Sequence, residues 1–419
     1  MMKNIIDSIW ALPRDLVSDG YDQAIDALSD MLPMRIHEYP TGTECFTWIV
    51  PEKWTCRDAR LETMDGKTLF SYKDNPLHAV SYSLPYSGEV DRETLFQHLH
   101  TRPDMPEAIP FIFKYYKRDW GLCCRHSLKQ TLTDDTYRVV IDTEFTQGAL
   151  KVGEVVVKGK KQDCYIFCAH LCHPAQTNDD MAGVAVGMDV FRRLLEGPQP
   201  EYTYRLVILP ETIGSAAWLS HNESLIPHIK GGLFLEMLGT PHPHALQRSN
   251  TPDSQMDTIC RLITREADPK MWEDDFMKVI LNDERMFNGP GINVPMLSLS
   301  RVLQRDDLYD PPYSEYHTSL DTPDVLDWDN LNRSSRLVSR IIEAIEANRI
   351  PVPLFKGELF CSRFKSIDYA SMFHVMNAVI YRLDGEKSIA DIARESGLPY
   401  DDVVAFIEIL KKEKLVRLA

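Results

Sequence analysis

The chain has 419 residues, of which 44% are hydrophobic and 26% are charged, and its formal net charge at pH 7 is −16. This composition is ordinary for a globular protein and excludes the disordered, collagenous and low-complexity classes. At about 150 residues per domain, the length predicts two or three domains with sizeable cores. The negative charge supplies no general attraction to nucleic-acid phosphate or to an anionic membrane face.

The N-terminal segment and the cysteines indicate a cytoplasmic protein. The first apolar stretch is short and is interrupted by Asp7 and Pro13, so it lacks the continuous apolar segment of a signal peptide. No run approaches the roughly 18 apolar residues of a transmembrane helix. The nine cysteines are scattered and lack CxxC pairs, which is typical of reduced thiols in the cytosol. A cysteine-type structural zinc site is therefore not expected.

The first part of the chain changes from helical to β periodicity. Residues 1 to about 30 have helical spacing of apolar positions. Residues 34–160 alternate between apolar and polar and are punctuated by turn signals, which predicts strands, with Asp65 and its following Gly as a hairpin turn. A short helix over 91–100 interrupts this β segment. The aromatic run FIFKYYKRDW, residues 111–120, fits a half-buried strand as well as a functional segment.

Residues 163–350 repeat the order strand, loop, helix. Four apolar segments predict buried strands: CYIFCAH, YRLVILP, GGLFLEML and VPMLSLS. An amphipathic helix follows the first of them, and further helices follow the others. Apolar strands between helices indicate a parallel or mixed sheet that is covered on both faces. The prediction is a three-layer α/β/α domain.

The residues after the Pro-Val-Pro stretch at 351–353 predict a separate winged-helix unit. Three helical segments and a closing strand, LVRLA, follow the order of a helix-turn-helix with a wing. The unit contains ten basic and ten acidic residues, and its presumed recognition helix begins Tyr400-Asp401-Asp402. Carboxylates at that position would repel DNA phosphate and complement base edges poorly. We therefore expect this unit to dock within the chain or between subunits rather than to bind nucleic acid.

Candidate metal ligands and bases follow the strands of the α/β segment. They are His170, Asp179, Glu211, Glu236 and His317. Functional groups of open α/β sheets gather in loops at the carboxyl ends of strands. Imidazoles and carboxylates at one edge suit a hydrolytic zinc site, which needs an open coordination position and a carboxylate to accept a proton. A lone His or carboxylate at a strand end is more often structural, and Asp180 fits a helix cap, but the five together favour a metal site.

Five motifs resemble those of zinc aminopeptidases with the phosphorylase/hydrolase-like α/β/α fold. They are CAHLCHPAQTNDDMAGVA, LPETIGS, FLEMLG, NDERMFNGPGINVP and YHTSLDT, in the family's order. The whole chain is similar to a bacterial group in which this domain is split by an inserted β domain and followed by a winged helix. The segments PTGTECFTWIVPEKW and YYKRDWGLC carry that closer likeness. The resemblance implies an aminopeptidase-like domain of residues 1–56 and 153–350, a mostly β inserted domain of 57–152 and a winged helix of 351–419.

The resemblance also implies a role for each site residue. Asp179 would bridge two zinc ions, and His170 and Glu236 would complete one of the two sites. His317 would bind the second ion. Glu211 would be the general base that takes a proton from the attacking water and returns it to the leaving amine.

Two positions depart from the family's pattern. Thr212 stands where the family has a second glutamate ligand, so the second ion loses a carboxylate donor. His173 could replace that ligand, or Glu211 could shift from base to ligand, and the sequence leaves both open. The family's aspartate two residues after the first His is Cys172 here, whereas Asp321 remains available to orient a ligand. One or two zinc ions are compatible with these residues.

The sequence predicts metal-assisted hydrolysis of an amide bond in a small peptide or an amino-acylated metabolite. Zinc would polarise the carbonyl group and lower the pKa of water to about 7. Arg285 and Arg301 flank the late loops and are candidates to hold a substrate carboxylate or phosphate.

Two other function classes compete with the hydrolase. One is a non-catalytic binding or scaffold protein with a degenerate metal site, and the other is a winged-helix regulator with a sensory α/β domain. A base retained beside metal ligands favours the hydrolase, whereas the neutral winged helix and the net charge of −16 disfavour the regulator. Self-association as a homo-oligomer is expected, without a coiled-coil pattern to define its interface.

Overall fold

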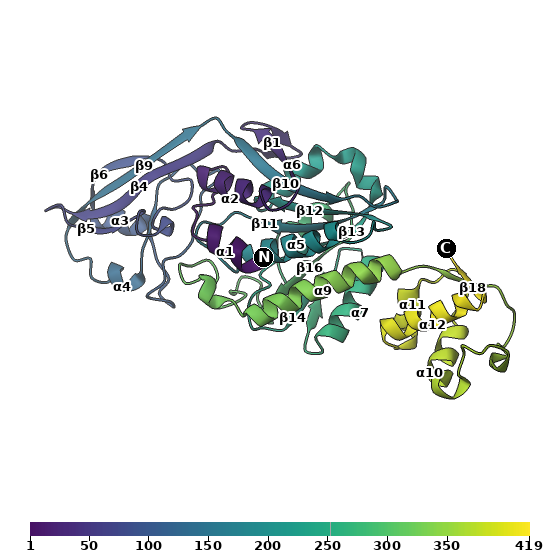
Figure 1. Cartoon of the computed structure of the whole chain (residues 1–419). Coiled ribbons are helices and arrows are strands. Elements are labelled where there is room, and N and C mark those ends of the chain that lie inside the picture. Colours follow the sequence, from purple (N-terminus) through teal and green to yellow (C-terminus); the bar gives the residue numbers. More distant parts are fainter. Residues whose placement is uncertain (252) are drawn as a thin grey trace.

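An eight-stranded mixed sheet forms the centre of the computed structural model, which describes residues 1–251 and 253–419 (Figure 1). The strand order is β1-β10-β12-β11-β13-β16-β14-β15. The strands are β1 (Met34–Pro40), β10 (Ala149–Val157), β11 (Cys164–His170), β12 (Thr203–Leu209), β13 (Ile229–Leu235), β14 (His244–Gln247), β15 (Trp272–Asp274) and β16 (Met296–Arg301). The four central strands are parallel, and β1, β10 and β14 join them in antiparallel pairs.

The central strands are buried because helices pack around the sheet. All seven residues of β11 are buried, as the continuous apolar run CYIFCAH predicts. The helices of this region are α1 (Met2–Ile9), α2 (Asp19–Ser29), α5 (Met181–Glu196), α6 (Ile213–Ser220), α7 (Gln255–Ala267), α8 (Glu284–Phe287) and α9 (Trp328–Ala347). Helix α5 packs on β11 and also contacts α1 and α9. The predicted mixed α/β fold with a large central sheet is confirmed.

A second, antiparallel sheet has the strand order β5-β4-β9-β6. Its strands are β4 (Lys53–Thr63), β5 (Thr68–Ser71), β6 (Tyr86–Asp91) and β9 (Thr136–Thr146). The predicted hairpin turn joins β4 to β5, and Gly66 adopts a φ of 88° there, which favours glycine. The strand pairs β2 (Glu44–Cys45) with β3 (Trp48–Ile49) and β7 (Leu99–His100) with β8 (Leu122–Cys123), and helices α3 (Arg92–His98) and α4 (His126–Lys129), complete this part of the chain.

The C-terminal residues form three helices and a two-stranded antiparallel sheet. The helices are α10 (Tyr369–Ile380), α11 (Ile389–Ser396) and α12 (Tyr400–Lys412), and the strands are β17 (Pro351–Pro353) and β18 (Val416–Leu418). The unit contacts the α/β region: the Tyr400 hydroxyl donates to the Ala344 carbonyl of α9 at 2.8 Å, and Arg340 pairs with Asp401. Within 1–251 and 253–419, none of the helices combines the length and apolar character of a membrane span.

Residues 111–120, for which the sequence allowed either a half-buried strand or a functional segment, do not form a strand. Their backbone pairs with loops instead, because the Phe111 amide donates to the His317 carbonyl at 2.8 Å and the Lys114 amide donates to the Ser81 carbonyl at 2.9 Å. A single isolated bridge joins Phe113 to Ser81. The segment therefore reaches from the second sheet to the loop that carries His317.

A buried arginine ties the N-terminal helices to the loop after β11. The Arg14 guanidinium donates four hydrogen bonds, at 2.6–2.8 Å, to the carbonyls of Ile9, Trp10, Leu171 and Gln176. Burial lowers the pKa of Arg14 to about 10, because desolvation outweighs the attraction of nearby acidic groups. The loop 171–176 is thereby held by a single side chain from outside it.

We expect Arg14→Met to lower the free energy of unfolding by about 3 kcal/mol or more, because three buried carbonyls and one partly buried carbonyl lose their donor. Urea denaturation measures the change. Arg35→Met removes an exposed arginine and should alter stability by about 0.5 kcal/mol or less. Equal effects of the two substitutions would contradict the role assigned to Arg14.

Candidate metal centre

The ends of three parallel strands bring the candidate ligands together. His170 is the last residue of β11, Glu211 follows β12, and Glu236 follows β13. Asp179 lies in the loop before α5, and His317 lies in the long loop before α9. The structure therefore brings together all five residues of the predicted set and, as a sixth, His173.

Asp179 lies at the centre of this cluster. Its Oδ1 is 3.1 Å from His170 Nε2, and its Oδ2 is 3.0 Å from His317 Nε2. His173 Nδ1 is 3.7 Å from the same carboxylate, and His170 Nε2 is 3.6 Å from Glu236 Oε1. Asp179 belongs both to a group with His170 and Glu236 and to a group with His173 and His317. One carboxylate between two ligand groups is the arrangement needed to bridge two metal ions.

The donor atoms of the cluster are buried without ordinary hydrogen-bond partners. Those atoms are His170 Nε2, His173 Nδ1 and Nε2, both carboxylate oxygens of Asp179, Glu236 Oε2 and His317 Nε2. Buried polar atoms are normally hydrogen-bonded, so each unpartnered atom needs an explanation. Neutral imidazole nitrogens and carboxylate oxygens that converge in this way fit zinc, whose ligands are these groups. The residues present therefore fit the metal that the sequence predicts.

Burial and mutual contact set the charges of the cluster. Desolvation raises the pKa of Glu236 well above its usual value, and His170 offsets only part of this effect. For Asp179, contacts with His173, His170 and His317 outweigh burial and hold the pKa well below its usual range. Contacts with Asp179, Cys172 and Glu236 likewise outweigh burial at His170 and raise its pKa well above normal. A bound cation must displace the His170 proton, so metal binding releases protons.

Glu211 stands at the edge of the cluster. Its Oε2 is 3.1 Å from His173 Nε2, and its side chain is 27% exposed, whereas His170, His173, Asp179 and Glu236 are almost fully buried. Burial raises the pKa of Glu211, but the contact with His173 outweighs it and holds the pKa below the usual value. The group is therefore a carboxylate at neutral pH, as a general base must be.

Neighbouring acidic residues fix the backbone around the ligands. Asp180 caps α5, as predicted, by accepting from the Gly183 amide at 2.9 Å, and it also accepts from the Met237 amide at 2.9 Å. Asp321 accepts from the Asn178 and Asp179 amides at 2.9 and 3.2 Å and from the Tyr313 hydroxyl at 2.9 Å. Asp321 thus positions the loop that carries Asp179 rather than contacting an imidazole.

Several residues of the centre have a left-handed backbone. The φ angles are 82° for His173, 61° for Thr212, 50° for Met237 and 53° for His317. Such conformations in residues other than glycine cost about 1–3 kcal/mol each and cluster at functional sites. They persist because the hydrogen bonds of Asp180 and Asp321 hold the surrounding loops.

Sequence reasoning missed two neighbours of the ligands, Phe111 and Asn282, and named a third, Cys172, only by its position. The Phe111 ring meets the rings of His173 and His317 edge-on, at centroid distances of 5.0 and 5.2 Å. The Asn282 side chain donates to Glu236 Oε1. The Cys172 thiol lies 3.7 Å from His170 Nδ1, where a side chain can help to orient the imidazole. Only Cys172 had a signal in the sequence, through its position two residues after His170.

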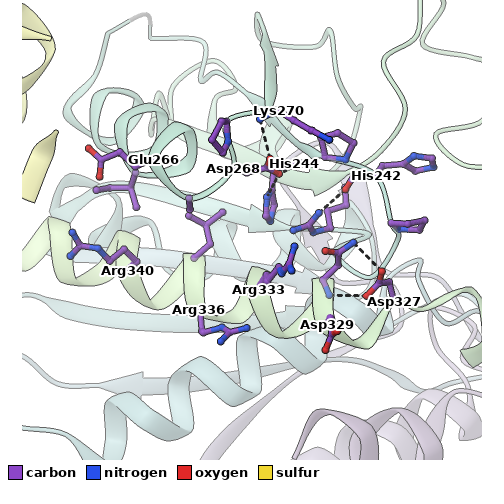
Figure 2. Close-up of a pocket in the computed structure, with 18 of the residues that line it drawn as sticks. His242, His244, Glu266, Asp268, Lys270, Asp327, Asp329, Arg333, Arg336 and Arg340 are labelled. Atoms are coloured by element: carbon purple, nitrogen blue, oxygen red, sulfur yellow. Dashed lines mark hydrogen bonds and ion pairs between the residues drawn. The ribbon is translucent and has the colours of Figure 1, made fainter. Parts of the chain in front are cut away.

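The two predicted substrate-binding arginines lie in different hollows. Arg285 lines a hollow of about 400 Å³ together with Glu211, Thr212, Trp48 and Phe113. Arg301 lines another hollow, of about 1080 Å³, which none of the candidate metal ligands lines (Figure 2). Arg285 is therefore the one that the structure brings beside the candidate base.

The comparisons with known proteins identify the family. A family model described as a domain of unknown function, DUF4910, matches residues 3–348. The chain belongs to this family. A Clostridium acetobutylicum relative, provisionally named a polysaccharide biosynthesis protein with an aminopeptidase-like domain, is 30% identical over 423 residues, which are 99% of this chain and 95% of the relative.

Solved structures share the fold of this chain. A crystal structure from Clostridium acetobutylicum, provisionally named a peptidase, has a TM-score of 0.90 and 31% identity and covers 100% of this chain and 96% of its own. A zinc aminopeptidase from Bacillus subtilis has a TM-score of 0.59 and 14% identity over 82% of this chain and 95% of its own. The structural neighbours are thus zinc aminopeptidases, and the predicted resemblance is confirmed.

We expect zinc at one or two ions per chain, and its loss in Asp179→Asn, because this carboxylate belongs to two of the ligand groups. Elemental analysis of protein purified without added metal measures the content. His317→Ala should release only the ion that His317 binds. Zinc content should also fall as the pH is lowered, since the ligands must be deprotonated.

The control is Asp26→Asn, which removes an exposed carboxylate of α2 and should leave the zinc content unchanged. A folded wild-type protein that neither contains zinc nor takes it up on reconstitution would contradict the metal centre.

Proposed function

We propose that this chain is a zinc-dependent hydrolase of the aminopeptidase type, which cleaves an amide bond of a small peptide or an amino-acylated metabolite. One observation carries the proposal: the Glu211 carboxylate touches the buried ligand cluster through His173 and also lines a hollow large enough for a small substrate. A base between a metal centre and a substrate-sized space is the arrangement that amide hydrolysis needs. The fold shared with zinc aminopeptidases supports the same reaction class.

In this proposal some side chains bind the metal and another transfers the proton. His170, Asp179, Glu236 and His317 would hold zinc, and His173 would supply the donor that Thr212 cannot. Zinc, when bound, polarises the substrate carbonyl and lowers the pKa of water to about 7. Glu211 takes a proton from water as the water oxygen bonds to the carbonyl carbon. It then delivers that proton to the leaving nitrogen as the C–N bond breaks.

Glu211→Gln should lower kcat by about 10²–10⁴-fold while zinc content stays at the wild-type value, because the amide keeps the shape of the side chain but cannot accept the proton. Hydrolysis of aminoacyl and acyl amides, with parallel elemental analysis, measures both quantities. Glu223→Gln changes an exposed glutamate outside the cluster and should leave both unaltered. Loss of zinc together with activity would show that Glu211 is a ligand rather than the base.

Within this class of substrates, the hollow beside Glu211 favours an amide that carries an anionic group over one with a free ammonium group. Trp48 and the half-exposed Phe113 offer aromatic surface, and Arg285 and Lys117 offer positive charge. The Arg285 guanidinium donates through Nε to the Asn282 carbonyl at 3.0 Å, and in the described residues it forms no ion pair. These cations would repel a substrate ammonium and attract a carboxylate or phosphate. We therefore propose an amide substrate that carries an anionic group.

Arg285→Gln should raise KM by about 10-fold or more for an amide that bears a carboxylate, with kcat little changed, because a charge-assisted hydrogen bond is worth roughly 1.5–3 kcal/mol. The uncharged analogue of the same amide should show almost no change. Arg57→Gln, on β4 of the second sheet, serves as the control. An equal rise in KM for both substrates would contradict this role for Arg285.

We also propose that residues 57–152 form an inserted domain and that 351–419 form a winged helix, as the resemblance implies. The separate sheet β5-β4-β9-β6 supports the first assignment, and the order of α10 to α12 before β18 supports the second. The contact of Tyr400 with α9 supports an internal docking role rather than nucleic-acid binding. The free state of all nine cysteines supports a cytoplasmic location, and self-association of the chain remains part of the proposal.

The observation that favours the alternative function is the loss of a carboxylate ligand at Thr212. A non-catalytic binding or scaffold protein would tolerate that loss. The backbone amide of Thr212 donates to Asp283 at 2.8 Å, so the residue keeps a structural contact without a ligand. The Glu211→Gln experiment separates the two functions, because a scaffold shows no hydrolysis to lose.

A further inference from the structure

The hollow of about 1080 Å³ lies between α7, the start of α9 and the loop before β14 (Figure 2). Asp401 of α12 also lines it, so the hollow adjoins the C-terminal helices. It contains none of the residues that the proposed hydrolysis uses. Its size matches the pockets that take small molecules.

Most carboxylates of this hollow already bind groups of the protein. Asp268 accepts from the His244 amide and ring at 3.0 and 2.9 Å, and Asp327 accepts from the Asn330 amide at 3.0 Å. Glu266 accepts from the Tyr400 amide at 2.6 Å, and Asp401 pairs with Arg340. Of the five acidic residues that line the hollow, only Asp329 lacks such a partner among the described residues. Four of the five carboxylates therefore have a partner within the protein, and that of Asp401 is a cation.

Most of the cations of the hollow, by contrast, have no ion-pair partner within 1–251 and 253–419. Of the five cations that line it, Arg340 pairs with Asp401, whereas no ion pair with a described residue is formed by the other four, Lys270, Arg301, Arg333 and Arg336. Figure 2 shows Arg333 on the side of α9 that faces His244 and Lys270, whereas Arg336 extends from the opposite edge of the same helix in this view. In a chain whose net charge is −16, four unpaired cations in one place are a marked local departure.

Arg301 gives the strongest indication of an anion site, because its side chain is buried. Its side chain is only 4% exposed. It donates through Nε to Ser334 Oγ at 3.0 Å and through Nη1 to the His242 carbonyl at 2.6 Å, and both acceptors are neutral. Burial lowers its pKa to about 10, because desolvation outweighs the attraction of Asp268 and Asp327. A buried guanidinium without a bound carboxylate is costly, and an anion in the adjoining space would offset that cost.

The spacing of the α9 cations fits more than one anionic group. Arg333 and Arg336 are three residues apart, which is about 4.5 Å along a helix axis, so their side chains leave the same helix within one turn. Arginine forks bind phosphate and carboxylate oxygens in pairs. A ligand that satisfies these side chains together with Arg301 and Lys270 needs at least two anionic groups.

We propose that this hollow binds a small polyanion, a molecule with two or more phosphate or carboxylate groups, held by Arg301, Arg333, Arg336 and Lys270. The site is independent of the proposed amide hydrolysis. Because Arg340 and Asp401 line the same hollow and join α9 to α12, the bound anion also stabilises the contact between the α/β region and the C-terminal helices.

Calorimetric titration of the zinc-loaded full chain tests the proposal, with inorganic pyrophosphate as the phosphate probe and citrate as the carboxylate probe. The variant is Arg333→Gln with Arg336→Gln, whose side chains are exposed and should not affect folding. The matched control is Lys158→Gln with Lys412→Gln, which removes two exposed positive charges outside the hollow. The control also separates this site from the metal centre, where either probe could bind zinc.

At least one probe should bind the wild type, and its affinity should fall tenfold or more in the arginine variant and by less than twofold in the lysine control. Tighter binding of pyrophosphate would assign the site to phosphorylated molecules, and tighter binding of citrate to polycarboxylates. Equal affinities in all three proteins, or no binding of either probe, would overturn the proposal. Retention of a DNA duplex by the same arginines, without binding of either probe, would assign the hollow to nucleic acid and also overturn it.

Discussion

The carboxylate of Asp179, buried among three imidazoles, is the constraint on which the centre of this fold depends. Its oxygens lie 3.0 to 3.7 Å from nitrogens of His170, His173 and His317. A buried charge is tolerated only when it is paired or binds a metal. The side chains at the strand ends, before α5 and in the loop before α9 must therefore lie close to one another. A shift of any of these elements would leave a buried charge unpaired.

The surrounding structure holds those elements by contacts from distant segments. Arg14 holds the loop 171–176 from the N-terminal region, and Asp321 holds the amides of Asn178 and Asp179 from the loop before α9. The left-handed backbone of His173 and His317 needs this support, since such conformations are unfavourable on their own. The stability of the protein and the geometry of its metal centre thus rest on the same hydrogen bonds.

The sequence predicted the strands and the ligand cluster because both follow from local pattern. The apolar runs that became β11, β12, β13 and β16 are buried on both faces, and parallel strand ends converge at one edge of a sheet. The edge-on contact of Phe111 with His173 and His317 was not predictable, because it depends on the pairing of two distant loops, in which the Phe111 amide donates to the His317 carbonyl. The sequence also did not predict that Arg285 and Arg301 lie in different hollows. This placement depends on side-chain direction, since Arg301 turns toward Ser334 of α9 while Arg285 stays beside Asn282.

The resemblance to zinc aminopeptidases implies a glutamate ligand at the position of Thr212, and its absence would have an electrostatic consequence for the proposed reaction. If His173 supplies the missing donor, a neutral imidazole takes the place of a carboxylate, and the metal-loaded centre carries one more unit of positive charge than the family's. Arg285 and Lys117 add positive charge in the adjoining hollow, where no carboxylate other than Glu211 is present among the described lining residues. Both changes weaken the binding of a substrate ammonium and strengthen the binding of an anionic group. The loss of one ligand and the character of the hollow therefore point to the same class of substrate, an acylated molecule with a negative charge near the scissile amide.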